Sequence, residues 1–102
     1  MTDLRIIEKW LVDDLVRIYA AYRGRVAPME YAVMLQVRIE GRMRTIRLFD
    51  NAHGSNEMHE YTGAEKQPAE PFLADQPPNE AMPATIEYLE NNWEEVLYSW
   101  KR

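Results

Sequence analysis

The chain has 102 residues, of which 46% are hydrophobic and 28% are charged, a composition typical of one folded domain spanning residues 1–102. It contains no cysteine, which excludes a disulfide scaffold, an iron–sulfur cluster, a cysteine-bound zinc site and a cysteine nucleophile. The formal net charge of −5 argues against a protein whose whole surface binds nucleic acid, although basic residues are concentrated in the first half of the chain.

The N-terminal segment, residues 3–23, fits either a helix or a pair of strands. A helix is favoured by apolar residues that recur every three or four positions, namely Leu4, Ile7, Leu11, Leu15, Ile18 and Tyr22. Two strands are favoured by the many β-branched residues and by Asp13-Asp14, which can form a turn between them. Residues 15–22 also alternate as the two faces of a strand would. The spacing of residues therefore leaves both structures open.

An antiparallel hairpin is predicted in the middle of the chain. Every second residue of its first strand is apolar, namely Tyr31, Val33, Leu35, Val37 and Ile39. Turn residues follow at Glu40-Gly41-Arg42, and residues 45–50 then resume a strand pattern. In this second strand we expect Ile46 and Leu48 to share one face and Arg47 to lie on the other.

One ten-residue stretch of this hairpin contains four arginines: Arg38, Arg42, Arg44 and Arg47. Such a concentration of positive charge on an otherwise acidic chain can form a local anion-binding site. The same pattern is also expected if the arginines simply occupy the solvated face of a half-buried pair of strands.

Both histidines of the chain, His53 and His59, lie just after the predicted hairpin. Imidazole exchanges protons near neutral pH, so two such rings can act as a general acid and a general base. Asp50 or Glu57 is available to orient a ring, and Gly54 suits a tight reversal of the chain between the histidines.

Three alternatives follow for this histidine-containing stretch. In the first, His53 and His59 cleave a phosphodiester without a metal ion, and an arginine stabilises the developing negative charge. In the second, the two histidines bind a divalent metal ion together with one carboxylate, from Asp50, Glu57 or Glu60. In the third, the stretch is a structural loop whose polar side chains bond to nearby backbone.

The last part of the chain contains a connector and a helix. Residues 60–79 include four prolines, and beyond a short strand near residues 58–62 we expect no regular structure there. A long helix follows, because apolar residues recur at helical spacing at Met82, Ile86, Leu89, Trp93, Val96 or Leu97, and Trp100. Asn79 is its predicted N-cap, which places Pro83 in the first turn.

Residues 37–42, 45–54, 58–61 and 66–67 resemble the corresponding parts of a set of small uncharacterised bacterial proteins. The shared pattern is a hairpin that ends in Asp-Asn-Ala-His-Gly, here residues 50–54, with a second histidine soon after, here His59. The chain is more remotely similar to TumE-type toxins of toxin–antitoxin modules, which carry an Arg, Asp-Asn and His arrangement at a strand end. The resemblance implies a β-meander followed by one helix, and hence two strands at residues 3–23.

The same resemblance implies an RNA-directed or growth-inhibiting activity. Carried over residue by residue, it assigns to the site Arg47, Asp50, Asn51, His53 and His59. The chain departs from a metal-site pattern at Asn56, where a further histidine would strengthen the metal alternative.

From these observations we predict an α+β domain, in which an antiparallel β-meander of three to five strands is covered on one face by the C-terminal helix. We expect Trp93 and Trp100 to pack on the sheet face formed by Val33, Leu35 and Val37. The start of the chain has no secretion signal and no apolar run approaches about 18 residues, so we expect a cytoplasmic location and no membrane partner.

The predicted function is that of a small toxin-like nuclease which acts on RNA without a metal ion or another cofactor. Its predicted catalytic residues are His53, His59, Asp50 and Asn51, and its predicted substrate-binding residues are Arg42, Arg44 and Arg47. The alternative function is a non-catalytic interaction domain, whose acidic second half binds a basic protein partner such as a cognate antitoxin.

Overall fold

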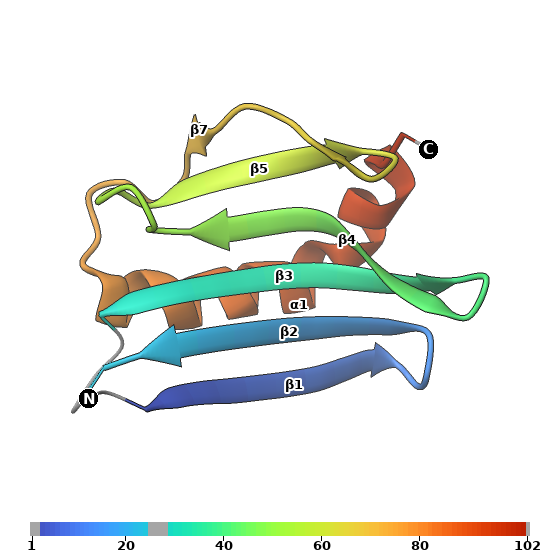
Figure 1. Ribbon diagram of the computed structural model, residues 1–102, viewed down its shortest axis with the longest axis horizontal. Coiled ribbons are helices and arrows are strands. Elements are labelled where there is room, and N and C mark those ends of the chain that lie inside the picture. The colour runs from blue at the N-terminus through green and yellow to red at the C-terminus, as the bar shows by residue number, and fades with distance from the viewer. Residues whose placement is uncertain (1–2, 25–28, 102) are drawn as a thin grey trace.

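The computed structural model describes residues 3–24 and 29–101 of the chain (Figure 1). These residues form one antiparallel sheet and one long helix, which confirms the predicted α+β class. The strands are β1 (Leu4–Val12), β2 (Val16–Arg23), β3 (Glu30–Ile39), β4 (Arg42–Asp50), β5 (Glu57–Thr62), β6 (Glu65–Lys66) and β7 (Glu70–Pro71), and the helix is α1 (Pro78–Ser99). The strands from β1 to β6 neighbour one another in chain order, β7 pairs with β5, and α1 lies against one face of the sheet.

The N-terminal segment forms the hairpin β1–β2, as the family resemblance implies, and not a helix. Asp14 lies in the connecting turn with φ of 60°, a left-handed conformation that aspartate tolerates better than most residues. The helical spacing in this segment has a simple explanation. Ile18 and Tyr22 belong both to the helical spacing and to the alternating pattern of β2. Val16, Ile18 and Ala20 are fully buried on the face of the sheet that α1 covers.

The central hairpin β3–β4 is confirmed, with a two-residue turn at Glu40 and Gly41. Both residues have positive φ, 53° and 78°, which is the requirement of a type I′ turn. The predicted faces of β4 are wrong, however, because the register shifts so that Leu35 pairs with Arg47 while Gln36 pairs with Thr45. Ile46 is therefore an extra residue in β4, a β-bulge. As a result Ile46 lies on the buried face, and Leu48 lies on the opposite, open face.

The connector contains more strand than the sequence indicated. Besides β5, the two-residue strands β6 and β7 bring the described sheet to seven strands, where three to five were expected. Both short strands run beside β5 through antiparallel pairs. Pro71 is accommodated in β7 because proline is tolerated where a strand does not need every backbone N–H.

The C-terminal helix is confirmed, but it starts earlier than predicted. The N-cap is Pro77, without a side-chain cap, so Asn79 lies inside the first turn rather than capping it. Pro83 consequently falls in the helix interior, not in the first turn. Proline there removes one backbone hydrogen bond, to the carbonyl of Asn79. Within the described residues, no helix is both long and apolar enough to cross a membrane.

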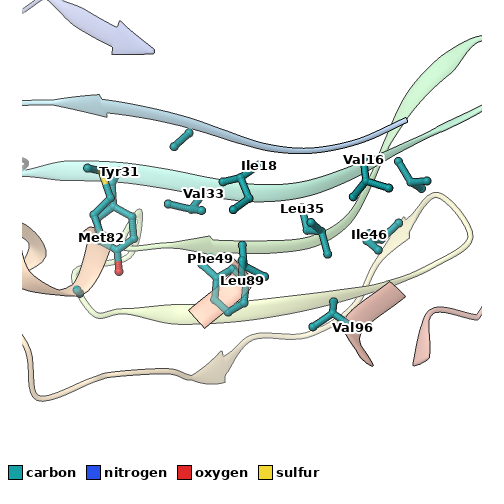
Figure 2. Close-up of a cluster of buried hydrophobic side chains, with 13 residues drawn as sticks. Val16, Ile18, Tyr31, Val33, Leu35, Ile46, Phe49, Met82, Leu89 and Val96 are labelled. Carbon is teal, nitrogen blue, oxygen red and sulfur yellow. The ribbon is translucent and has the colours of Figure 1, made fainter. Parts of the chain in front are cut away.

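The hydrophobic core lies between α1 and the face of the sheet that α1 covers (Figure 2). Its fully buried members include Ile18, Val33, Leu35, Phe49 and Leu89. Trp93 and Trp100 are partly buried and pack against this core, as predicted. Removing a buried leucine side chain costs about 2–5 kcal/mol, so the contact of Leu89 with the sheet is a main source of the helix's attachment.

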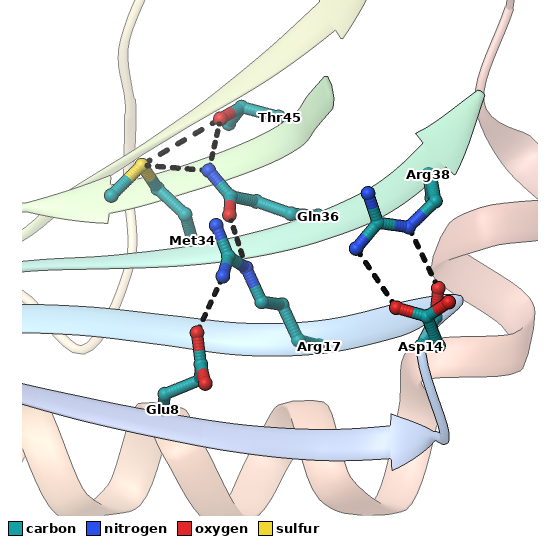
Figure 3. A network of polar contacts seen from close by, with 7 residues as sticks. All are labelled: Glu8, Asp14, Arg17, Met34, Gln36, Arg38 and Thr45. Carbon is teal, nitrogen blue, oxygen red and sulfur yellow. Dashed lines mark hydrogen bonds and ion pairs between the residues drawn. The ribbon is translucent and has the colours of Figure 1, made fainter. Parts of the chain in front are cut away.

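The other face of the sheet has no helix over it and carries a polar network along β1 to β4 (Figure 3). Arg17 donates to Glu8 and to Gln36, and Gln36 donates to Thr45. At the end of β3, Arg38 pairs with Asp14. These charged groups satisfy one another, so this part of the open face does not present free charge to a ligand.

Candidate functional site

The candidate site lies where β4 ends and β5 begins, on the open face of the sheet. Asp50 is paired with Glu57 across the two strands, and Leu48 with His59. The pair between them, Phe49 and Met58, belongs to the helix-covered core. Because successive side chains of a strand point to opposite faces, Asp50, Glu57 and His59 all point away from α1.

These three side chains form a compact cluster. One ligand atom from each of Asp50, Glu57 and His59 lies within 4.8 Å of the others. Asp50 is only 8% exposed and His59 only 6% exposed. Glu57 Oε2 lies 3.8 Å from His59 Nε2, which is too long for a hydrogen bond. The sheet thus holds two carboxylates and an imidazole together out of water, without direct bonds between them.

The hydrogen bond of His59 determines which ring nitrogen is available. Nδ1 lies 2.9 Å from the carbonyl oxygen of Gln67, and a carbonyl only accepts, so Nδ1 carries the proton and donates it. In the neutral ring Nε2 then carries a lone pair, directed into the cluster. Neither Nε2 nor Glu57 Oε2 has a hydrogen-bond partner, although both atoms are buried. Buried polar atoms without partners are rare in folded proteins and require an explanation, such as a bound ion, water or substrate.

The negative charge of Asp50 affects the pKa of two nearby tyrosines. Burial, and after it the nearby carboxylate of Asp50, raise the pKa of Tyr31 to about 12. Burial and then Asp50 also raise the pKa of Tyr61. Both effects show that the field of Asp50 acts within a poorly solvated environment.

His53 is not part of this cluster. It lies in the exposed turn between β4 and β5, whereas His59 is the third residue of β5 and is buried. Asn51 is occupied by the fold: its Oδ1 accepts from the backbone N–H of Tyr31, and its Nδ2 donates to the carbonyl of Met29. The structure therefore brings His59 together with Asp50 and Glu57, and leaves His53 and Asn51 outside.

The three predicted substrate-binding arginines lie on the wrong face for this cluster. Arg42, Arg44 and Arg47 are paired with Ile39, Val37 and Leu35, all on the side of the sheet that faces α1. Arg47 donates to Glu60 and to Ser99 of the helix. The bulge at Ile46 explains this placement of Arg47. Glu60, which was one of the carboxylates considered for a metal site, is likewise paired with Arg47 on the helix side.

A hollow of about 220 Å³ adjoins the cluster at Asp50, and Glu57 and His59 are not among its lining residues. Asp50 forms part of its wall, together with Ala21 and Ala32, whose small side chains leave the space open, and with the exposed Arg23. A ligand in this hollow would reach Asp50 from the open face of the sheet. Among the described residues Arg23 is the basic side chain that lines it, and no pattern in the sequence distinguishes this arginine from the others.

Sequence reasoning also missed two groups that support the site. The carbonyl of Gln67 orients His59, and a backbone acceptor has no signature in a sequence. Asn56 is buried and connects β3 to the segment between β7 and α1. Its side chain accepts a hydrogen bond from the Tyr31 hydroxyl and donates to the carbonyls of Leu73 and Gln76. Asn56 therefore has a structural role near the site, and it is not a ligand.

The cluster suits either proton exchange or metal binding. Asp50, Glu57 and His59 offer two oxygens and one nitrogen, a donor set suited to divalent ions of the first transition series. The same atoms can accept and release protons from a bound molecule. A pair of imidazoles, by contrast, would require His53 to reach a cluster from which it is absent.

The chain belongs to a family described as a domain of unknown function (DUF7718), whose profile matches residues 2–102. No curated protein and no solved structure matches the chain.

Proposed function

We propose that this member of the DUF7718 family is a small cytoplasmic, toxin-like nuclease that cleaves RNA at the cluster of Asp50, Glu57 and His59. The observation that carries the proposal is the buried His59 Nε2, which faces Glu57 and Asp50 without a hydrogen-bond partner. A reacting group placed there would be contacted by all three side chains.

The energetic cost of the cluster supports a functional role. A buried polar atom without a partner costs about 1–3 kcal/mol, and a buried carboxylate without a counter-charge costs more. Apolar residues at these positions of β4 and β5 would give a more stable sheet. Groups that lower stability in this way are found where a protein binds or transforms a ligand.

RNA as the substrate is supported by two observations. The resemblance to TumE-type toxins implies an RNA-directed activity for a site of Arg47, Asp50, Asn51, His53 and His59, of which Asp50 and His59 lie in the cluster. In addition, Arg23 lines the hollow beside Asp50 and can contact a phosphate group. Arg42, Arg44 and Arg47 have no part in this proposal, because they lie on the opposite face of the sheet from His59.

The proposal is tested by incubating purified protein with single-stranded RNA and by measuring growth of cells that express it. We expect the wild type to cleave RNA and slow growth, and His59→Gln to lose both effects. His53→Ala is the matched control and should retain both. Equal loss in His53→Ala and His59→Gln would restore the two-imidazole mechanism, and an inactive wild type would refute the nuclease function.

A second candidate function, a non-catalytic domain that binds a basic partner such as a cognate antitoxin, is favoured by a different surface. Glu80, Glu87 and Glu94 are all exposed and recur every seven residues, so they form an acidic stripe along α1. If this function holds, changing all three to glutamine weakens binding of a basic protein partner in a pull-down, His59→Gln leaves that binding intact, and the wild type does not cleave RNA. The nuclease function instead predicts that the wild type cleaves RNA and that His59→Gln alone removes this cleavage.

A further inference from the structure

We propose that Asp50, Glu57 and His59 bind one divalent metal ion of the first transition series, such as Zn²⁺ or Mn²⁺. This ion site goes beyond the nuclease function and does not depend on it. It differs from the metal alternative that the sequence suggested, since it uses two carboxylates and one histidine, and His53 takes no part.

The separations between the three side chains fit a single ion. Two ligand atoms at about 2.1 Å from one ion lie at most about 4.2 Å apart. The 3.8 Å between His59 Nε2 and Glu57 Oε2 already satisfies this limit. All three ligand atoms lie within 4.8 Å of one another, so closing the site requires only small side-chain movements. The ligands come from two adjacent, hydrogen-bonded strands, which holds them in place before an ion arrives.

The orientation of His59 is the one that a metal ligand requires. A histidine that binds a metal through one nitrogen usually donates the N–H of the other to a carbonyl or carboxylate, which fixes the tautomer. In this protein the Gln67 carbonyl plays that part at 2.9 Å from Nδ1. Nε2 is left buried, unprotonated in the neutral ring and without a partner. A surface histidine or a histidine in a simple structural loop has no need of such an arrangement.

The charge balance also calls for a cation. Among the described residues, no lysine or arginine forms an ion pair with Asp50 or Glu57. The nearest hydrogen-bond donors are weak ones: Ser55 to Glu57 and the backbone N–H of Ala52 to Asp50, both at 3.4 Å. A buried carboxylate beside a half-buried one, with so little compensation, is unfavourable. A divalent ion offsets both charges and supplies the partner that Oε2 and Nε2 lack.

Three protein ligands leave coordination positions open, as in catalytic rather than purely structural metal sites. The hollow lined by Asp50 is the side from which a bound molecule would approach those positions. An ion there would also supply the positive charge that an anionic phosphodiester needs near an acidic cluster, by acting as a Lewis acid.

The test is ion binding by the purified chain after treatment with a chelator and dialysis. Calorimetric titration with Zn²⁺ and with Mn²⁺, together with native mass spectrometry, should give one ion per chain for at least one of these metals. Asp50→Asn, Glu57→Gln and His59→Gln should each weaken binding by at least about tenfold. His53→Ala should bind as the wild type does.

Several results would overturn the site: no binding of either ion by the wild type, unchanged affinity in Glu57→Gln, or loss of binding in His53→Ala. The fold of each variant is checked by circular dichroism in chelator. Glu57→Gln keeps the test decisive if His59→Gln does not fold, because the amide replaces the carboxylate without changing its shape. Ion binding without RNA cleavage would refute the nuclease function alone, and cleavage by a chain that binds no ion would refute the ion site alone.

Discussion

Replacing Glu57 with glutamine should make the metal-free protein more stable. Glu57 Oε1 accepts from the Ser55 hydroxyl, and a glutamine carbonyl can keep that bond. The amide nitrogen then takes the place of Oε2, 3.8 Å from the lone pair of His59 Nε2, and a small movement forms a hydrogen bond. The substitution thus gives a partner to two buried atoms and removes one half-buried charge.

The expected size follows from the single hydrogen bond that would join these two atoms. Leaving a buried polar atom unsatisfied costs about 1–3 kcal/mol, so Glu57→Gln should raise the free energy of unfolding by about 1–3 kcal/mol. For a domain of this length each kcal/mol corresponds to about 4–8 °C in the melting temperature. With a bound ion the order should reverse, since the wild type gains the binding energy of the ion and the variant loses it.

The assay is urea unfolding in chelator near pH 8, where free histidine is neutral. Glu60→Gln is the matched control: Glu60 lies on the same strand but on the helix side, and its side chain is 57% exposed. A glutamine carbonyl can still accept from Arg47, so this change should alter stability by less than about 1 kcal/mol. A Glu57→Gln protein less stable than the wild type in chelator would refute the reasoning.

Three further predictions concern the fold. Pro83→Ala should raise the free energy of unfolding by roughly 1–2 kcal/mol in urea, because it gives the Asn79 carbonyl its helical partner; an unchanged midpoint would contradict this. Gly41→Ala should lower it by roughly 1 kcal/mol, purely through the φ of 78°, since no atom lies within 4 Å of the added Cβ; a neutral result would argue against the type I′ turn. The third prediction concerns alkaline pH. The pKa of Tyr31 is about 12 in the folded protein and 10.0 for the free side chain. The stability that protonated Tyr31 contributes is therefore fully present below pH 10.0 and is lost as the pH rises toward 12. Base titration in chelator, followed by phenolate absorbance, should show this loss, and Tyr31→Phe should be less sensitive over the same range.

The sequence predicts the parts of the fold that depend on local patterns. The alternation in β3 identifies its buried face, and Glu40-Gly41 identifies the turn, because both depend only on neighbouring residues. The faces of β4 depend on the extra residue at Ile46, which no alternation reveals. For the same reason Arg47 was expected on the solvated face.

The candidate site is likewise predicted where it depends on local sequence and missed where it depends on folding. The stretch 50–61 is where the functional side chains lie, and His59 and Asp50 are both in the cluster. The partnership of His53 with His59 remains a prediction from proximity in the sequence, and the structure offers Glu57 as the neighbour of His59 instead. Cross-strand pairing of Asp50 with Glu57, and the Gln67 carbonyl behind His59, arise only when the chain is folded.

The most direct measurement is a crystal structure of the wild type soaked in Mn²⁺, with data collected for anomalous scattering. We expect one anomalous peak between the side chains of Asp50, Glu57 and His59, with His59 Nε2 as a ligand and His53 uninvolved. An empty cluster in crystals exposed to Mn²⁺ and to Zn²⁺, or a peak bound at His53, would contradict it.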